Sequence, residues 1–127
     1  ANALAGQPAV QAELLALVGR VRGSLGAFDE ARPPLERALA IRRTRLGAAH
    51  PDAAASVADL AELDEREGRY AAAERGFRAA LATQRAALGD TAAATLATMF
   101  RLGHLLHAVG RPRDAAPVIA EWEGRLA

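Results

Sequence analysis

The chain has 127 residues, of which 51% are hydrophobic and only 4% aromatic, and 16 basic and 15 acidic residues give a net charge of +1. A chain of this length can bury one core, and its interspersed charges argue against a nucleic-acid or membrane-surface binder, which usually carries a clustered basic field. The absence of cysteine excludes disulfides, thiolate catalysis and cysteine-ligated zinc. Because no apolar run approaches a membrane span and no leader pattern opens the sequence, we expect a cytoplasmic protein.

The first predicted pair of helices lies within residues 8–47. Its second helix contains Pro33 and Pro34 four to five residues from its start. Proline lacks the N–H that a helix interior needs, but Pro117 recurs two repeat periods after Pro33. This recurrence favours a late helix start or a slight kink at that position, not a broken helix.

The second pair of helices lies within residues 50–89 and carries the clearest signals. His50-Pro51-Asp52 predicts a helix start, since proline fits the first turn and the Asp52 carboxylate complements the helix dipole. Gly68 ends this helix, and a second helix follows over residues 70–88. Its Ala73, Phe77, Ala80 and Leu81 share one face, and Gly89 is a C-terminal stop.

The third pair lies within residues 92–127 and differs from the others at its last helix. Trp122 stands where the earlier pairs have Ala38 and Ala80. We expect this bulky side chain to cover the open face of the last pair in place of a following repeat. The alternative is that Trp122 anchors a partner.

The three pairs are copies of one unit with a period of 42 residues. The period is visible in Gly26, Gly68 and Gly110 and in Leu35, Phe77 and Ile119. We therefore expect one all-α domain over residues 1–127, with repeats at about 8–47, 50–89 and 92–127. Leu4-Ala5 matches Leu46-Gly47 one period later, so we also expect the chain to be part of a longer protein or array.

The segment from Leu46 to Gly89, LGAAHPDAAASVADLAELDEREGRYAAAERGFRAALATQRAALG, resembles the tetratricopeptide repeat (TPR), in the 42-residue form of kinesin light chains and many bacterial signalling proteins. The resemblance implies a right-handed superhelical solenoid of three helix-turn-helix hairpins, about six helices, whose first helices line a concave groove. Two departures are that Asp64 stands where tyrosine is usual and Ala58-Asp59 where Asn-Asn is common. Such asparagines often bind the backbone of a guest peptide in the family.

The resemblance implies a partner-binding groove formed by polar and large residues of the first helices, with Ser24 and Glu65 on the same side. The expected binding residues are Glu13, Leu17, Arg20, Asp59, Glu62, Arg66, Phe100, Arg101, His104 and His107.

The charges in this set have two interpretations. In the first, Asp59 and Glu62 meet a basic side chain of a peptide while Arg101 holds a carboxylate. In the second, the same charges form salt bridges between repeats on a solvated surface. A stricter model, the carboxylate clamp of chaperone-binding repeats, is rejected because only Arg101 matches its pattern.

The sequence predicts no metal, no cofactor and no catalytic residue. His104 and His107 share a helix face, but a third ligand would have to be a carboxylate, so we interpret them as surface histidines. The serines and threonines are interpreted as packing or capping residues.

The favoured function is a noncatalytic interaction module that binds a protein or peptide partner in the groove, in a bacterial signalling or regulatory assembly. The alternative is a structural segment of a longer solenoid that stacks end to end or self-associates through its ends. No nucleic acid and no membrane is expected as a partner.

Overall fold

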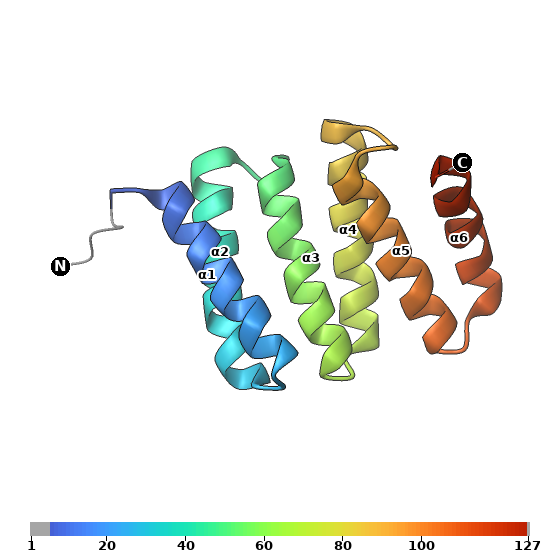
Figure 1. Cartoon of the computed structure of the whole chain (residues 1–127), viewed down its shortest axis with the longest axis horizontal. Coiled ribbons are helices and arrows are strands. Elements are labelled where there is room, and N and C mark those ends of the chain that lie inside the picture. Colours follow the sequence, from blue (N-terminus) through green and yellow to red (C-terminus); the bar gives the residue numbers. More distant parts are fainter. Residues whose placement is uncertain (1–5, 127) are drawn as a thin grey trace.

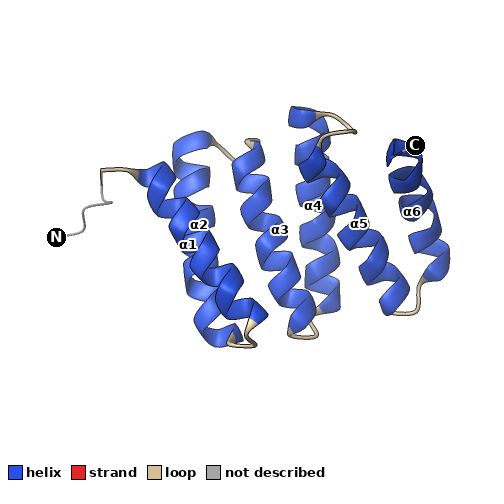
Figure 2. Ribbon diagram, in the orientation of Figure 1, coloured by secondary structure: helices blue, strands red, loops and turns tan. Residues whose placement is uncertain are grey.

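The computed structural model describes residues 6–126, so the Leu4-Ala5 match lies outside the described residues. This part of the chain is all-helical, which confirms the predicted fold class (Figures 1 and 2). The helices are α1 (Pro8–Ser24), α2 (Phe28–Leu46), α3 (Pro51–Arg66), α4 (Tyr70–Leu88), α5 (Ala93–Ala108) and α6 (Pro112–Leu126). None of them combines the length and the apolar character needed to cross a membrane.

The helices form three hairpins, which stand side by side along the longest axis of the molecule (Figure 1). Each helix packs against its neighbours in the chain. In addition, α1 approaches α3, and α3 approaches α5, whereas within residues 6–126 the second helices do not approach one another in this way. The row of hairpins is therefore closer together on the side of α1, α3 and α5. These first helices line the inner side of the solenoid.

The predicted boundaries of the second hairpin are confirmed. α3 begins at Pro51, and the imidazole Nδ1 of His50 accepts a hydrogen bond from the Asp52 N–H at 3.0 Å, which caps one of the free donors of the first turn. α3 ends just before Gly68, whose φ of +82° is a left-handed conformation that a side chain would strain.

The prolines inside α2 do not delay its start. The helix begins at Phe28, so of the two expected alternatives the late start is wrong, and the chain passes through Pro33 and Pro34 in an unbroken helix. Because Pro34 has no N–H, the Glu30 carbonyl one turn earlier loses its normal donor. The Arg22 guanidinium donates to that carbonyl at 3.1 Å instead. A side chain of α1 thereby makes the proline tolerable.

Small residues set the distance between the helices. Gly19, Ala61 and Gly103 occupy the same repeat position. A Cβ on Gly19 would lie 2.4 Å from the Leu35 Cγ, far inside contact distance. The close helices bury a core around Phe77, which is fully buried and packs with residues of both the second and the third hairpin. Each hairpin therefore completes the core of its neighbour.

Arginines of α2 join the first two hairpins. The Arg42 guanidinium donates to Ser56 Oγ and to Glu13 Oε2, both at 2.9 Å. Arg32 donates to Asp64 Oδ1 at 2.7 Å and Glu67 Oε1 at 2.6 Å. Asp64, the departure from the usual tyrosine, is thus one acceptor of a bridge between repeats.

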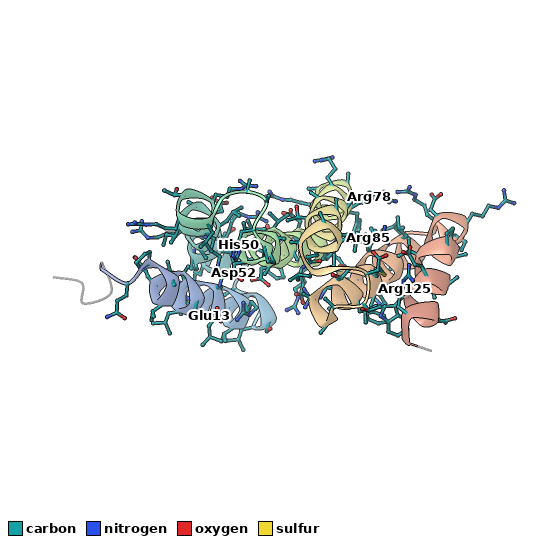
Figure 3. All side chains as sticks on the ribbon, turned by 90° about the horizontal axis from the view of Figure 1, so that it is seen from above. Glu13, His50, Asp52, Arg78, Arg85 and Arg125 are labelled. Atoms are coloured by element: carbon teal, nitrogen blue, oxygen red, sulfur yellow. The ribbon has the colours of Figure 1, made fainter. Side chains whose placement is uncertain are left out.

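Two further ion pairs connect α6 with α4 and with the loop that follows α4. Arg85 lies 2.8 Å from Glu121, and Arg125 lies 3.3 Å from Asp90 in the loop after α4. Figure 3 labels both arginines and shows them on the part of the molecule formed by the later helices.

Candidate binding groove

Three cavities that share lining residues follow one another from the first hairpin to the last, and we call them together the inner groove. A cavity of about 200 Å³ is lined by residues of α1, α2, α3 and α5, among them Arg20, Asp59 and Arg101. A second, of about 530 Å³, shares Glu62, Arg66 and Arg101 with the first. A third, of about 250 Å³, shares Phe100 and His104 with the second. The shared residues place the cavities next to one another, the first two along the first helices and the third between α5 and α6.

Eight of the ten residues expected in the groove line these cavities, and two do not. The eight are Arg20, Asp59, Glu62, Arg66, Phe100, Arg101, His104 and His107. Glu13 instead receives the Arg42 hydrogen bond and lines a cavity at the outer end of the first hairpin. Leu17 is half exposed and lies outside the three groove cavities. Sequence reasoning could not separate these two, because they have the same helical spacing as the others.

Asp59 is less available to a partner than its position in the sequence suggests. Its side chain is only 9% exposed, and Arg20 of the preceding hairpin lies 3.1 Å from its carboxylate. Burial raises the pKa of Asp59, and the attraction of Arg20 opposes that change. The second interpretation of the charges therefore describes this pair: it is an ion pair between repeats.

Glu62 lies between two arginines. Arg66 of the same helix is 2.9 Å from its carboxylate, and Arg101 of the next hairpin is 3.2 Å away on the other oxygen. A ligand carboxylate that approached either arginine would have to compete with Glu62. The middle of the groove is thus lined by charges that already have partners.

Glu65 is the exception among the groove carboxylates. Its side chain is 23% exposed, and the only basic group recorded within salt-bridge distance of it in residues 6–126 is His104, at 3.9 Å. Burial is the main cause that raises the pKa of Glu65, while His104 attracts its charged form. Glu65 is therefore a partly buried acid with no arginine at hydrogen-bond distance.

The C-terminal end of the groove is aromatic. The Phe100 and Trp122 rings lie 5.2 Å apart at 45°, and the His104 ring stacks near Phe100 at 6.1 Å and 29°. Trp122 is partly buried and packs against the core, in agreement with the expected covering role. It also lines the third cavity with Ile119 and Glu123, and sequence reasoning missed both of these as groove residues.

The N-terminal end carries an apolar stripe along α1. Its residues are exposed aliphatic side chains: Val10, Leu14, Leu17, Val18, Val21 and Leu25. The contrast with the other hairpins is clear at Val21, which is 49% exposed, whereas the equivalent Leu63 and Leu105 are buried. In the second and the third hairpin, this face of the first helix is covered by the hairpin that comes before it in the chain.

The described residues hold no cluster of three or more histidine, cysteine or carboxylate side chains suited to a metal. Three buried hydroxyls have structural partners. Ser56 accepts from Arg42, Thr95 donates to the Gly89 carbonyl at 2.9 Å, and Thr98 donates to the Ala94 carbonyl at 3.2 Å. They act as packing and capping groups, as predicted.

The chain is similar to known proteins in sequence and in fold. The family model described as the tetratricopeptide repeat matches it over residues 10–78 and 52–118. No curated protein matches it in sequence. Crystal structures of nearly identical TPR-like repeats of kinesin light chain type from Podosopora anserina, in two forms that differ by one substitution, superpose with TM-scores of 0.77 and 0.76 at 24% identity. The similar region covers 87% of this chain and 52% of those chains, so this chain spans about half of their length.

Proposed function

The chain belongs to the tetratricopeptide repeat family, whose repeats generally mediate protein–protein contacts, and we propose that its inner groove binds an extended peptide or a partner domain. The observation that carries this proposal is the succession of three adjoining cavities across all three hairpins. Their lining changes from hairpin to hairpin, while the buried positions repeat. A curved surface with varied side chains on a repetitive scaffold suits recognition of a segment of chain.

We further propose that the protein is a noncatalytic scaffold in a bacterial signalling or regulatory assembly in the cytoplasm. Repeats of this family typically act as scaffolds without catalysis. The buried hydroxyls, which are engaged with arginine or with the backbone, support this proposal.

A random-peptide display library tests the groove. We expect wild-type protein to select peptides whose binding falls at least about tenfold in the Phe100→Ala and Arg101→Ala variants. The matched control is Arg78→Ala, which removes an exposed arginine on α4 that pairs with Glu74 away from the groove. Peptides that bind all four proteins equally, or a failure to select any peptide, would contradict groove binding.

The alternative function, end-to-end stacking or self-association, is supported by the apolar stripe on α1. Five exposed aliphatic side chains on α1, with Leu25 directly after it, form a surface that water solvates poorly. In this alternative the stripe packs against another hairpin or a second copy, as α3 packs against α2.

Sedimentation over a range of concentrations tests this alternative. Self-association should appear in the wild type and disappear in Val21→Arg, which places a charge in the stripe. Leu88→Arg, at an exposed leucine on α4, is the control and should behave as wild type. A monomer at every concentration counts against self-association.

A further inference from the structure

The third hairpin, at the C-terminal end of the inner groove, differs from the first two hairpins at two positions. These are positions through which each of the first two hairpins contacts the next one. Ala16 and Ala58 are buried in the first helices of their hairpins, and the third hairpin has Phe100 at this position. Ala38 and Ala80 are likewise buried in the second helices, and the third hairpin has Trp122. Aromatic residues in the third hairpin thus replace both of the alanines that the first two hairpins have.

This replacement gives the third hairpin a different surface at the positions through which the first two hairpins contact the next one. Close packing of helices depends on small side chains at the contact, and two rings fill the space that two methyl groups leave open. Phe100 stays 50% exposed, and its ring lies against Trp122. The rings leave the third cavity of about 250 Å³, bordered by Ile119 and Glu123. This space is large enough for one bulky side chain.

The charges beside this pocket favour a cation over an anion. Arg66 and Arg101 both lie against Glu62, so neither is free to meet a ligand carboxylate without losing that contact. Within residues 6–126 the one basic group at salt-bridge distance from Glu65 is the His104 imidazole, at 3.9 Å. Glu65 lines the second cavity together with Tyr70, Phe100 and the two arginines that lie against Glu62. A partly buried carboxylate beside aromatic faces attracts a guanidinium or ammonium group through both charge and cation–π interaction.

From this arrangement we propose that the groove end recognises a peptide segment with a bulky apolar side chain in the Phe100–Trp122 pocket and a lysine or arginine at Glu65. This inference rests on the proposed groove binding and adds the chemistry of the ligand. The two cavities share Phe100 and His104, so the proposal places the two ligand side chains close in sequence. In an extended peptide, residues two apart point to the same side, about 7 Å from each other, so an apolar-x-basic pattern fits.

Trp122 is the only tryptophan of the chain, so its fluorescence reports directly on this pocket. The probe is the synthetic peptide acetyl-Gly-Leu-Ser-Arg-Gly-amide, titrated into the full chain. We expect a saturable change in Trp122 emission with a dissociation constant below about 1 mM. The comparison peptides replace arginine by glutamate or leucine by alanine, and each should bind at least about fivefold more weakly.

Variants assign the two contacts. Phe100→Ala should weaken the leucine-arginine peptide about tenfold, and Glu65→Gln about three- to tenfold, with little change for the glutamate peptide. Because Phe100 is half exposed, its truncation should leave the fold intact, which circular dichroism checks. Arg78→Ala is again the control. Equal binding of the arginine and glutamate peptides, or no loss in Phe100→Ala, would overturn the inference.

The outcome is separable from that of the proposed function. If library peptides bind the groove through Phe100 and Arg101 but lack the apolar-x-basic pattern and leave Glu65→Gln unaffected, groove binding stands and this ligand chemistry is wrong. If no peptide binds and Trp122 emission stays constant up to about 1 mM, both are wrong. Trp122 would then act only as a cover for the core.

Discussion

Arg20 of the first hairpin lies 3.1 Å from the buried carboxylate of Asp59 in the second, 39 residues away in sequence. The pair spans the beginning of the inner groove and connects two repeat units. Asp59, which the sequence predicts on the binding face, therefore contributes to the contact between the two hairpins.

Arg20→Ala should therefore destabilise the protein by about 1–3 kcal/mol at neutral pH, because it leaves Asp59 buried without its cation. Burial already raises the pKa of Asp59, and loss of Arg20 should raise it further. A raised pKa means that the protonated form is favoured in the fold, so the cost of the variant should shrink as the pH falls through that pKa. Urea unfolding from about pH 7 down to about pH 4 measures this trend.

The matched control is the same substitution in the Asp59→Asn background. There the neutral amide needs no cation, so Arg20→Ala should cost much less and lose its pH dependence. An equal cost in both backgrounds would mean that Arg20 acts through packing alone.

The Arg32 bridge to Glu67 should lose its stabilisation at a lower pH than the pair of Arg20 and Asp59. The hydrogen bond from Arg32 is the main cause that lowers the pKa of Glu67 below its usual 4.5. Its stabilisation is thus fully present above about pH 4.5 and is lost as the pH falls through the lower folded value. Arg32→Ala should destabilise the chain by about 1–2 kcal/mol at neutral pH and equal the wild type only in stronger acid. Denaturant midpoints that differ equally at every pH would contradict this account.

Gly19→Ala should destabilise the first hairpin although alanine is the better helix former. A Cβ there would meet Leu35 at 2.4 Å, and overpacking of this kind typically costs about 1–3 kcal/mol, more than the gain of about 1 kcal/mol in helix propensity. Gly124→Ala is the control, since α6 leaves open space around that position. It should be neutral or stabilising by up to about 1 kcal/mol. Thermal unfolding of the two variants should shift in different directions.

Gln84→Met should stabilise the chain by about 1 kcal/mol. Gln84 occupies in α4 the position of Arg42 in α2, but its buried Oε1 has no hydrogen-bond partner among the described residues. The equivalent of Ser56 is Thr98, whose hydroxyl donates to the Ala94 carbonyl. Methionine has a similar shape and no such polar oxygen. A lower free energy of unfolding in Gln84→Met would show that the amide has a partner.

The period of 42 residues was sufficient to predict the hairpins because each helix boundary depends on local chemistry. Pro51, Gly68 and Gly89 start and stop helices through their own backbone constraints, wherever the helix is later packed. The repeated position of Leu35, Phe77 and Ile119, buried in the first two hairpins and partly buried in the third, was visible for the same reason: core positions repeat because the contacts between hairpins repeat.

Which of the acidic groove residues pair with an arginine depends on the tertiary structure. Asp59, Glu62 and Glu65 have the same helical spacing and similar chemistry, so the sequence could not tell which acid has an arginine and which has none. Arg20 comes from the preceding hairpin and Arg101 from the following one, and their reach depends on how closely α1, α3 and α5 pack.

The sequence by itself determined the family and the number of hairpins, since local backbone preferences and a repeated apolar pattern fix these features. Only the tertiary structure decided that Glu13 and Leu17 lie outside the groove, that Asp59 is part of a joint and that Trp122 forms a pocket with Phe100. The reason is physical: burial, pairing and pocket shape are properties of side chains from several helices, and they arise only when those helices pack together.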